Sequence, residues 1–151
     1  MNFASRILAK PIPEDLPAPL GNYVAVAVRG DAGYVSGQFP IADGRLAYAG
    51  RLGYELDLRQ GQAAAELSAL NALGQIRKAL GALDKVTIAR IDGFIASASD
   101  FGEQPTVLNG ASDVFADALG ARGLHARTVF AVPRLPMNSP IELVVTFHLG
   151  A

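Results

Sequence analysis

The chain has 151 residues, half of them hydrophobic and 18% charged, and its formal net charge is −1. This length suits one domain with one core, and the apolar content excludes a disordered chain. No run of Lys or Arg is present, so the composition argues against a nucleic-acid partner. So few charged residues predict either a well-filled core or a surface that is partly covered in an oligomer.

The chain contains no cysteine, which excludes disulfides, thiol catalysis and thiolate metal sites. Its two histidines, His125 and His148, stand in no known metal-ligand spacing, so we expect neither a metal nor another cofactor. No stretch reaches the roughly 18 apolar residues of a membrane span, and the first residues do not resemble a signal peptide. The sequence therefore predicts a cytoplasmic protein without a membrane partner.

The first half of the chain predicts an arm, a hairpin and a helix. Prolines are frequent toward the end of residues 1–22, which favours an extended N-terminal arm. Alternating β-branched residues around a Gly-Asp turn predict a hairpin with strands at 23–29 and 34–39. Residues 43–54 allow either a further strand pair or a long loop. Leucines at three- and four-residue steps predict a helix over 62–80, followed by a cap glycine.

The second half predicts three more strands and one helix. Residues 87–97 follow the first helix as a strand, and residues 109–120 form a second helix with Asn109 as its candidate cap. The last two strands are predicted at 124–132 and 141–149. This order predicts one α+β domain over the whole chain, with a mixed sheet and two helices packed on one face.

Arg127 is the residue that most needs an explanation. It lies in the apolar strand at 124–132, on the same side as Val129 and Ala131, and we expect both faces of this strand to be covered. A guanidinium cannot lose its charge, so its burial requires an anion. Glu142 in the next strand is one candidate, and a ligand carboxylate or phosphate is the other.

Other candidate residues also have a structural and a functional interpretation. Gly37 interrupts an apolar strand, which indicates either a bulge or the close approach of a ligand to the backbone. Tyr23 is either strand packing or part of a site, and Asn109 is either a helix cap or part of a site. His125 falls on the strand face of Arg127, where an ordinary surface or hydrogen-bonded histidine is more common than a catalytic one.

Four segments of the sequence together resemble the RidA/YjgF family of imine deaminases, also known as the endoribonuclease L-PSP family. They are YVSGQFP, LNALGQI, QPTVLNGASDVF and the long stretch HARTVFAVPRLPMNSPIELVV. The spacing from Arg127 through Arg-Leu-Pro at 134–136 to Ile141 and Glu142 makes the resemblance specific. It extends from about residue 23 to residue 147.

The resemblance implies a chorismate-mutase-like α+β fold and a homotrimer with sites in the clefts between subunits. In active members an arginine at the position of Arg127 grips the carboxylate of a 2-imino or 2-enamino acid. Backbone carbonyls and a glutamate, here Glu142, position the attacking water, and the products are a 2-keto acid and ammonia. The family's site positions correspond to Tyr23, Ser36, Gly37, Asn109, Arg127, Val129 and Glu142.

The chain also departs from the archetypal deaminases. The arm and residues 43–61 look longer, Val129 replaces a cysteine, Thr128 stands where serine is usual, and the GASDVF segment lacks an aromatic residue that the archetype has there. These differences predict a divergent branch of the family. Two other functions therefore stay open: a non-catalytic trimeric protein that binds or senses small carboxylates, and an endoribonuclease or translation inhibitor. The even charge balance argues against the second of these.

Overall fold

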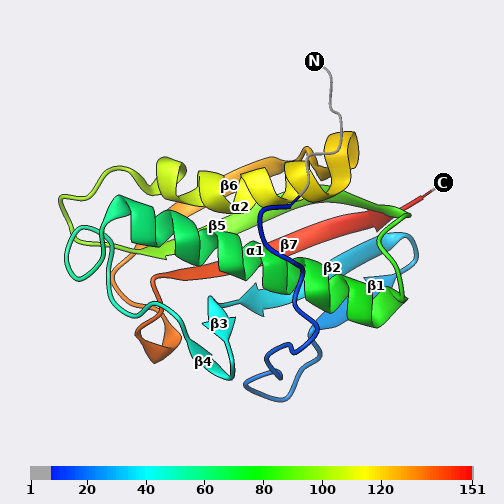
Figure 1. The fold of residues 1–151 in the computed structure, drawn as a ribbon, viewed down its shortest axis with the longest axis horizontal. Helices are drawn as coiled ribbons and strands as arrows, with labels where there is room; N and C mark the ends of the chain where they lie inside the picture. Colours follow the sequence, from blue (N-terminus) through cyan, green and yellow to red (C-terminus); the bar gives the residue numbers. More distant parts are fainter. Residues whose placement is uncertain (1–7, 151) are drawn as a thin grey trace.

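A five-stranded mixed sheet carries two helices on one of its faces in the computed structural model, which describes residues 8–150 (Figure 1). The strand order is β1-β2-β7-β5-β6; β5 and β6 run parallel, and every other pair is antiparallel. This confirms the predicted α+β architecture. The elements are β1 (Val26–Arg29), β2 (Ala32–Gln38), α1 (Leu58–Leu80), β5 (Val86–Ala96), α2 (Gln104–Leu119), β6 (Ala126–Val132) and β7 (Ile141–Leu149).

The core fills the space between the helices and the inner face of the sheet. Alternate residues of β5 and β7 point inward and are fully buried, whereas their neighbours point to the outer face. Helix α1 contributes Leu73 and Ile76, and α2 contributes Leu108 and Phe115. The inward strand residues are Ile88, Ile91, Ile95, Ile141, Leu143, Val145 and Phe147.

Both helices begin earlier than their apolar pattern predicts. Helix α1 starts at Leu58 because Asp57 and Gln60 form a reciprocal capping box. It ends at Gly81, which has φ 85° and caps it as predicted. Helix α2 starts at Gln104, so Asn109 lies inside this helix and the prediction that it caps the N-terminus is wrong.

Strand β6 forms an edge of the sheet, and its outer face is left partly open by residues 8–150, so the expectation that both its faces are covered is wrong within the described chain. Its inner face lies toward α2. On its outer face Phe130 is 43% exposed and stacks on Phe94 of β5, with ring centroids 5.1 Å apart. An apolar strand face indicates that something covers it, but it does not show that the cover comes from the same chain.

The described part of the predicted arm, residues 8–22, contains no helix or strand and crosses α1 (Figure 1). Arg77 of α1 donates to the carbonyl of Ile12 at 3.0 Å, and Gln75 donates to that of Pro17 at 3.0 Å. Residues 1–7 of the arm lie outside the described residues. The ambiguous segment after β2 is a small strand pair, β3 (Ile41–Ala42) and β4 (Arg45–Leu46), followed by a loop.

Gly110 sets the distance between the two helices, which gives a first prediction. A Cβ at this position of α2 would overlap the carbonyl oxygen of Gln62 on α1. We expect Gly110→Ala to lower the free energy of unfolding by about 1–3 kcal/mol, although alanine favours a helix intrinsically. Gly102→Ala is the matched control because nothing lies within 4 Å of its added Cβ. Urea denaturation measures both, and an unchanged or raised stability for Gly110→Ala would contradict the prediction.

Candidate active site

Arg127 projects from β6 toward α2 and is held there by three neutral acceptors. Its Nη1 donates to Asn109 Oδ1 at 2.8 Å and to Ser112 Oγ at 3.1 Å, and its Nη2 donates to the carbonyl of Pro105 at 3.1 Å. All three acceptors belong to α2, which therefore fixes the plane of the guanidinium. No carboxylate among residues 8–150 forms a salt bridge with Arg127.

The hydrogen bonds of Arg127 leave part of its donor set unused. A guanidinium has five N–H donors, and three are occupied here. Nη1 makes two of these bonds and Nη2 makes one, so Nε and Nη2 keep donor capacity that no other group among residues 8–150 uses. In a guanidinium, Nε and Nη2 share the edge that can hold both oxygens of a carboxylate. The half-buried side chain thus presents a preformed anion-binding edge.

His125, just before β6, contacts two residues of α2 beside Arg127. Its Nε2 lies 2.9 Å from Ser112 Oγ and its Nδ1 lies 2.6 Å from the carbonyl oxygen of Gly123. Its ring meets the edge of Phe115 with centroids 5.7 Å apart. Burial lowers the pKa of His125, the Gly123 carbonyl partly opposes this shift, and the charge of Arg127 adds to it. The imidazole is therefore neutral at pH 7.

The lowered pKa of His125 predicts a loss of stability in mild acid. Below the ordinary histidine pKa the unfolded chain takes up a proton that the folded chain resists, so the free energy of unfolding falls as pH falls. His125→Gln removes this titration. As the pH falls from about 8 to about 5, we expect the free energy of unfolding to decrease more in the wild type than in His125→Gln. Urea denaturation across this range measures it, and parallel pH curves would contradict it.

Glu142 occupies the opposite, outer face of the sheet. It is half-buried on β7, pairs with Phe94 of β5, and lies against Gly37 of β2. A Cβ on Gly37 would overlap the carboxylate, so only glycine permits this approach. The pairing register of β2 shifts between Val35 and Gln38, as expected for a bulge at Gly37, while the close approach of a ligand to its backbone stays a prediction. Burial raises the pKa of the Glu142 carboxyl above its ordinary value.

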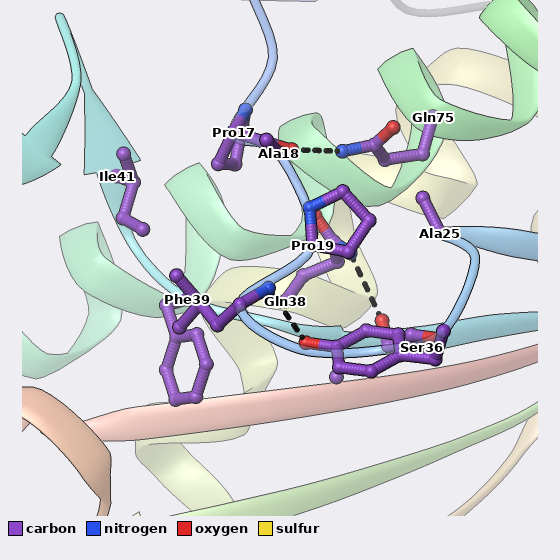
Figure 2. Close-up of a pocket in the computed structure, with 12 residues that line it drawn as sticks. Pro17, Ala18, Pro19, Ala25, Ser36, Gln38, Phe39, Ile41 and Gln75 are labelled. Carbon is purple, nitrogen blue, oxygen red and sulfur yellow. Dashed lines mark hydrogen bonds between the residues drawn. The ribbon is translucent and has the colours of Figure 1, made fainter.

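Tyr23 and Ser36 lie beside Gly37, where β2 extends beyond the end of β1. Ser36 Oγ donates to the carbonyl of Val24 at 2.7 Å, and the hydroxyl of Tyr23 accepts from the amide of Leu20 at 3.1 Å. A small pocket separates this end of β2 from the arm. Figure 2 shows Pro17, Ala18 and Pro19 between Gln75 of α1 and Ser36. The arm therefore forms one wall of the space beside Gly37.

The structure separates the predicted site residues into two groups. Arg127 and Asn109 lie near α2 together with Val129, which packs on the core, whereas the other four lie around β2 and the outer face. Strand β5 stands between β6 and β7, and Arg127 and Glu142 point to opposite faces of the sheet. The proposed ion pair between Arg127 and Glu142 is therefore absent. Within one chain, the two groups do not come together in a single site.

Two partners of Arg127 were missed by the sequence reasoning. Ser112 and the carbonyl of Pro105 hold the guanidinium, and Ser112 also connects it to His125. The only available signal was helical spacing: Pro105, Asn109 and Ser112 lie at steps of four and three residues and so share one helix face. Among residues 8–150 no group of His, Asp and Glu is arranged to hold a metal ion, and no helix is long and apolar enough to cross a membrane.

Comparison with known families identifies the fold. The family model described as "YjgF/chorismate mutase-like, putative endoribonuclease" matches residues 4–149. Protein TCP17 of Trypanosoma cruzi is 39% identical over 135 residues, which cover 88% of this chain and 84% of that protein.

Solved structures give the same result. The crystal structure of Atu1372 from Agrobacterium tumefaciens, a protein of unknown function, is 40% identical with a TM-score of 0.84, covering 87% of this chain and 85% of that one. A putative endoribonuclease from Shewanella oneidensis is 34% identical with a TM-score of 0.88, covering 91% of each chain. RidA from a Psychrobacter species is 24% identical with a TM-score of 0.63, covering 91% of this chain and 96% of that one. The chain belongs to the YjgF/chorismate mutase-like (RidA) family, in a branch that has diverged from RidA itself.

Proposed function

We propose that this protein hydrolyses reactive 2-imino acids, and their 2-enamino tautomers, to 2-keto acids and ammonia. The observation that carries the proposal is the charge of Arg127, which forms no ion pair with a carboxylate among residues 8–150. The side chain is half-buried, is fixed by three neutral acceptors and keeps donor capacity on Nε and Nη2 within the described chain. A permanent cation held in this way suits a ligand carboxylate.

Glu142 supplies the second part of the proposed chemistry. A carboxylate with a raised pKa is a better general base at neutral pH than an ordinary one. Water adds to C2 of the protonated imine, and Glu142 takes a proton from this water. Glu142 then gives that proton to the amino group of the resulting carbinolamine. The C–N bond breaks and ammonia leaves, while the hydroxyl proton passes to Glu142 and then to solvent as C2 becomes a ketone. An iminium carbon already reacts with water, so positioning and charge stabilisation are sufficient.

The two halves of the site come together in a homotrimer in this proposal. Arg127 of one subunit would face Glu142, Gly37 and Tyr23 of a neighbour across a cleft. The stacked aromatic pair Phe94 and Phe130 on the outer face, of which Phe130 is exposed, supports this arrangement, because exposed apolar surface of this kind suits a contact surface. Sedimentation equilibrium tests it. A monomer at micromolar concentration would leave the site without its second half and would refute the shared cleft.

The comparisons support a small amino-acid-like ligand for this fold. The structure of TdcF from E. coli, which is 22% identical with a TM-score of 0.64, contains bound serine. Serine has the α-carboxylate and the nitrogen-bearing C2 that a 2-imino acid also has. We infer the same ligand class here, with the carboxylate on Arg127.

The decisive experiment generates a 2-imino acid in place with an amino-acid oxidase and measures keto-acid release with and without the protein. We expect acceleration that survives exhaustive chelation, because the proposed chemistry uses only side chains and water. A protein that binds 2-keto acids without accelerating release is instead a carboxylate sensor. Cleavage of RNA without action on imines would favour the endoribonuclease activity in the family's description.

A further inference from the structure

A chain of hydrogen bonds leads from Arg127 into the protein, away from the proposed ligand. It passes from Arg127 Nη1 to Ser112 Oγ at 3.1 Å, from Ser112 Oγ to His125 Nε2 at 2.9 Å, and from His125 Nδ1 to the carbonyl oxygen of Gly123 at 2.6 Å. Neither Ser112 nor His125 belongs to the proposed reaction. Both side chains are partly buried. Ser112 belongs to α2, and the His125 ring packs against Phe115 of the same helix.

The donor and acceptor at each link follow from the chemistry of the groups. A carbonyl oxygen can only accept, so His125 Nδ1 carries a hydrogen toward Gly123. The neutral ring then has Nε2 as an acceptor, and the Ser112 hydroxyl donates to it. The hydroxyl hydrogen is thereby turned away from Arg127, and a lone pair of Ser112 Oγ faces Nη1. His125 thus makes Ser112 an acceptor for the guanidinium.

Ser112 is the most protected of the three groups that hold Arg127. Asn109 and Pro105 are exposed, and water competes for both of their oxygens. The Ser112 oxygen is fixed by the partly buried imidazole of His125, whose ring packs against Phe115. Without it, the two remaining acceptors leave the guanidinium free to tilt on the exposed rim of α2.

We infer that Ser112 and His125 are positioning residues for Arg127, which keep its unused donors directed at the carboxylate of a 2-imino acid. The inference rests on the proposed function, since it assigns these residues to the same site. It predicts an effect on ligand binding and not on the chemical step. Arg127 binds the substrate carboxylate equally in the ground state and the transition state. Weakening this interaction therefore raises KM and leaves kcat unchanged.

Ser112→Ala is the first test. We expect KM for the 2-imino acid to rise about tenfold, in line with the loss of one hydrogen bond to a charged group, while kcat stays within about twofold. Calorimetry should show that the Kd for the 2-keto acid rises by the same factor. Ser68→Ala is the matched control, because Ser68 is a buried serine of α1 whose hydroxyl has no hydrogen-bond partner among residues 8–150.

Two substitutions of His125 separate positioning from packing. His125→Gln keeps an acceptor for the Ser112 hydroxyl, and we expect nearly wild-type KM and Kd. His125→Leu keeps an apolar filling but no acceptor, and we expect the same increase in KM as in Ser112→Ala. The double variant Ser112→Ala/His125→Leu should be no worse than either single variant, because His125 acts through Ser112.

The outcomes distinguish this inference from the proposed function. An active wild type with unchanged KM and Kd in Ser112→Ala overturns the inference alone, and so does equal weakening by His125→Gln and His125→Leu. A wild type that neither hydrolyses imines nor binds 2-keto acids overturns both. Thermal melting checks that each variant folds, and if His125→Leu does not fold, Ser112→Ala decides the question.

Discussion

Arg127→Ala is expected to abolish both imine hydrolysis and 2-keto acid binding while leaving the protein folded. The substitution removes the donors that we propose for the ligand carboxylate. Its cost to stability is small, about 1 kcal/mol, because Asn109 and Pro105 are exposed to water that can replace the lost hydrogen bonds, and Ser112 keeps its hydrogen bond to His125. A residue paired with a buried carboxylate would instead cost about 3–5 kcal/mol. Melting curves and the imine assay on the same samples measure both effects.

Arg127→Lys tests whether the charge of Arg127 is sufficient or the geometry of its donors is also required. A lysine keeps the charge, but its ammonium cannot occupy three acceptors on α2 and still present a fork to a carboxylate. We expect it to fold normally and to lose most binding. Arg29→Ala is the matched control, since Arg29 is exposed and donates only to the carbonyl of Val28. Full activity in either Arg127 variant would remove Arg127 from the mechanism, and a drop of several kcal/mol in stability would return it to a structural role.

Glu142→Gln is expected to stabilise the protein and to stop its proposed reaction. Burial raises the folded-state pKa of this carboxyl, so the folded chain holds a proton more tightly than the unfolded chain does. The stability from this group is fully present below its ordinary pKa and is lost as pH rises through the raised one. At neutral pH the ionised Glu142 carboxylate therefore lowers the free energy of unfolding. The amide has the same shape without the charge, so the melting temperature should rise at about pH 7 and not at about pH 4.

The same substitution removes the proposed general base. We expect kcat to fall by about 10²–10⁴-fold while 2-keto acid binding through Arg127 remains. Glu14→Gln, on an exposed part of the arm, is the matched control and should change neither property. If Glu142→Gln retains wild-type kcat, the water is activated by another group. If it melts at a lower temperature at neutral pH, the carboxylate makes stabilising contacts that burial does not reveal.

The fold could largely be predicted because most of its elements are locally encoded. The Gly-Asp turn, the leucine periodicity of α1 and the final strand Ile141–Leu149 all follow rules of short range. The helix starts were missed for a local reason as well. The apolar pattern begins after the capping box at Asp57 and Gln60, and Pro105 signals the first turn of α2 better than Asn109 does.

The site could be predicted only as a set of residues. Sequence spacing identified Arg127 and Glu142 as charges in apolar strands, but it gave no information about which strands are neighbours. The insertion of β5 between β6 and β7 separates the two charges, and only the tertiary structure shows it. The link between Ser112 and His125 is equally nonlocal, because a helix turn and a strand entry 13 residues apart must be packed together before it exists.

The position of β7 in the sheet has a consequence for how the protein is made. This strand is the last one in the sequence, yet it lies at the centre and joins the hairpin β1-β2 to the parallel pair β5-β6. While residues 141–149 remain in the ribosome exit tunnel, the emerging chain holds two separate sheet fragments, each too small to be stable alone. The sheet therefore cannot form until residues 141–149 have left the tunnel, and a chain truncated before this strand is expected to aggregate.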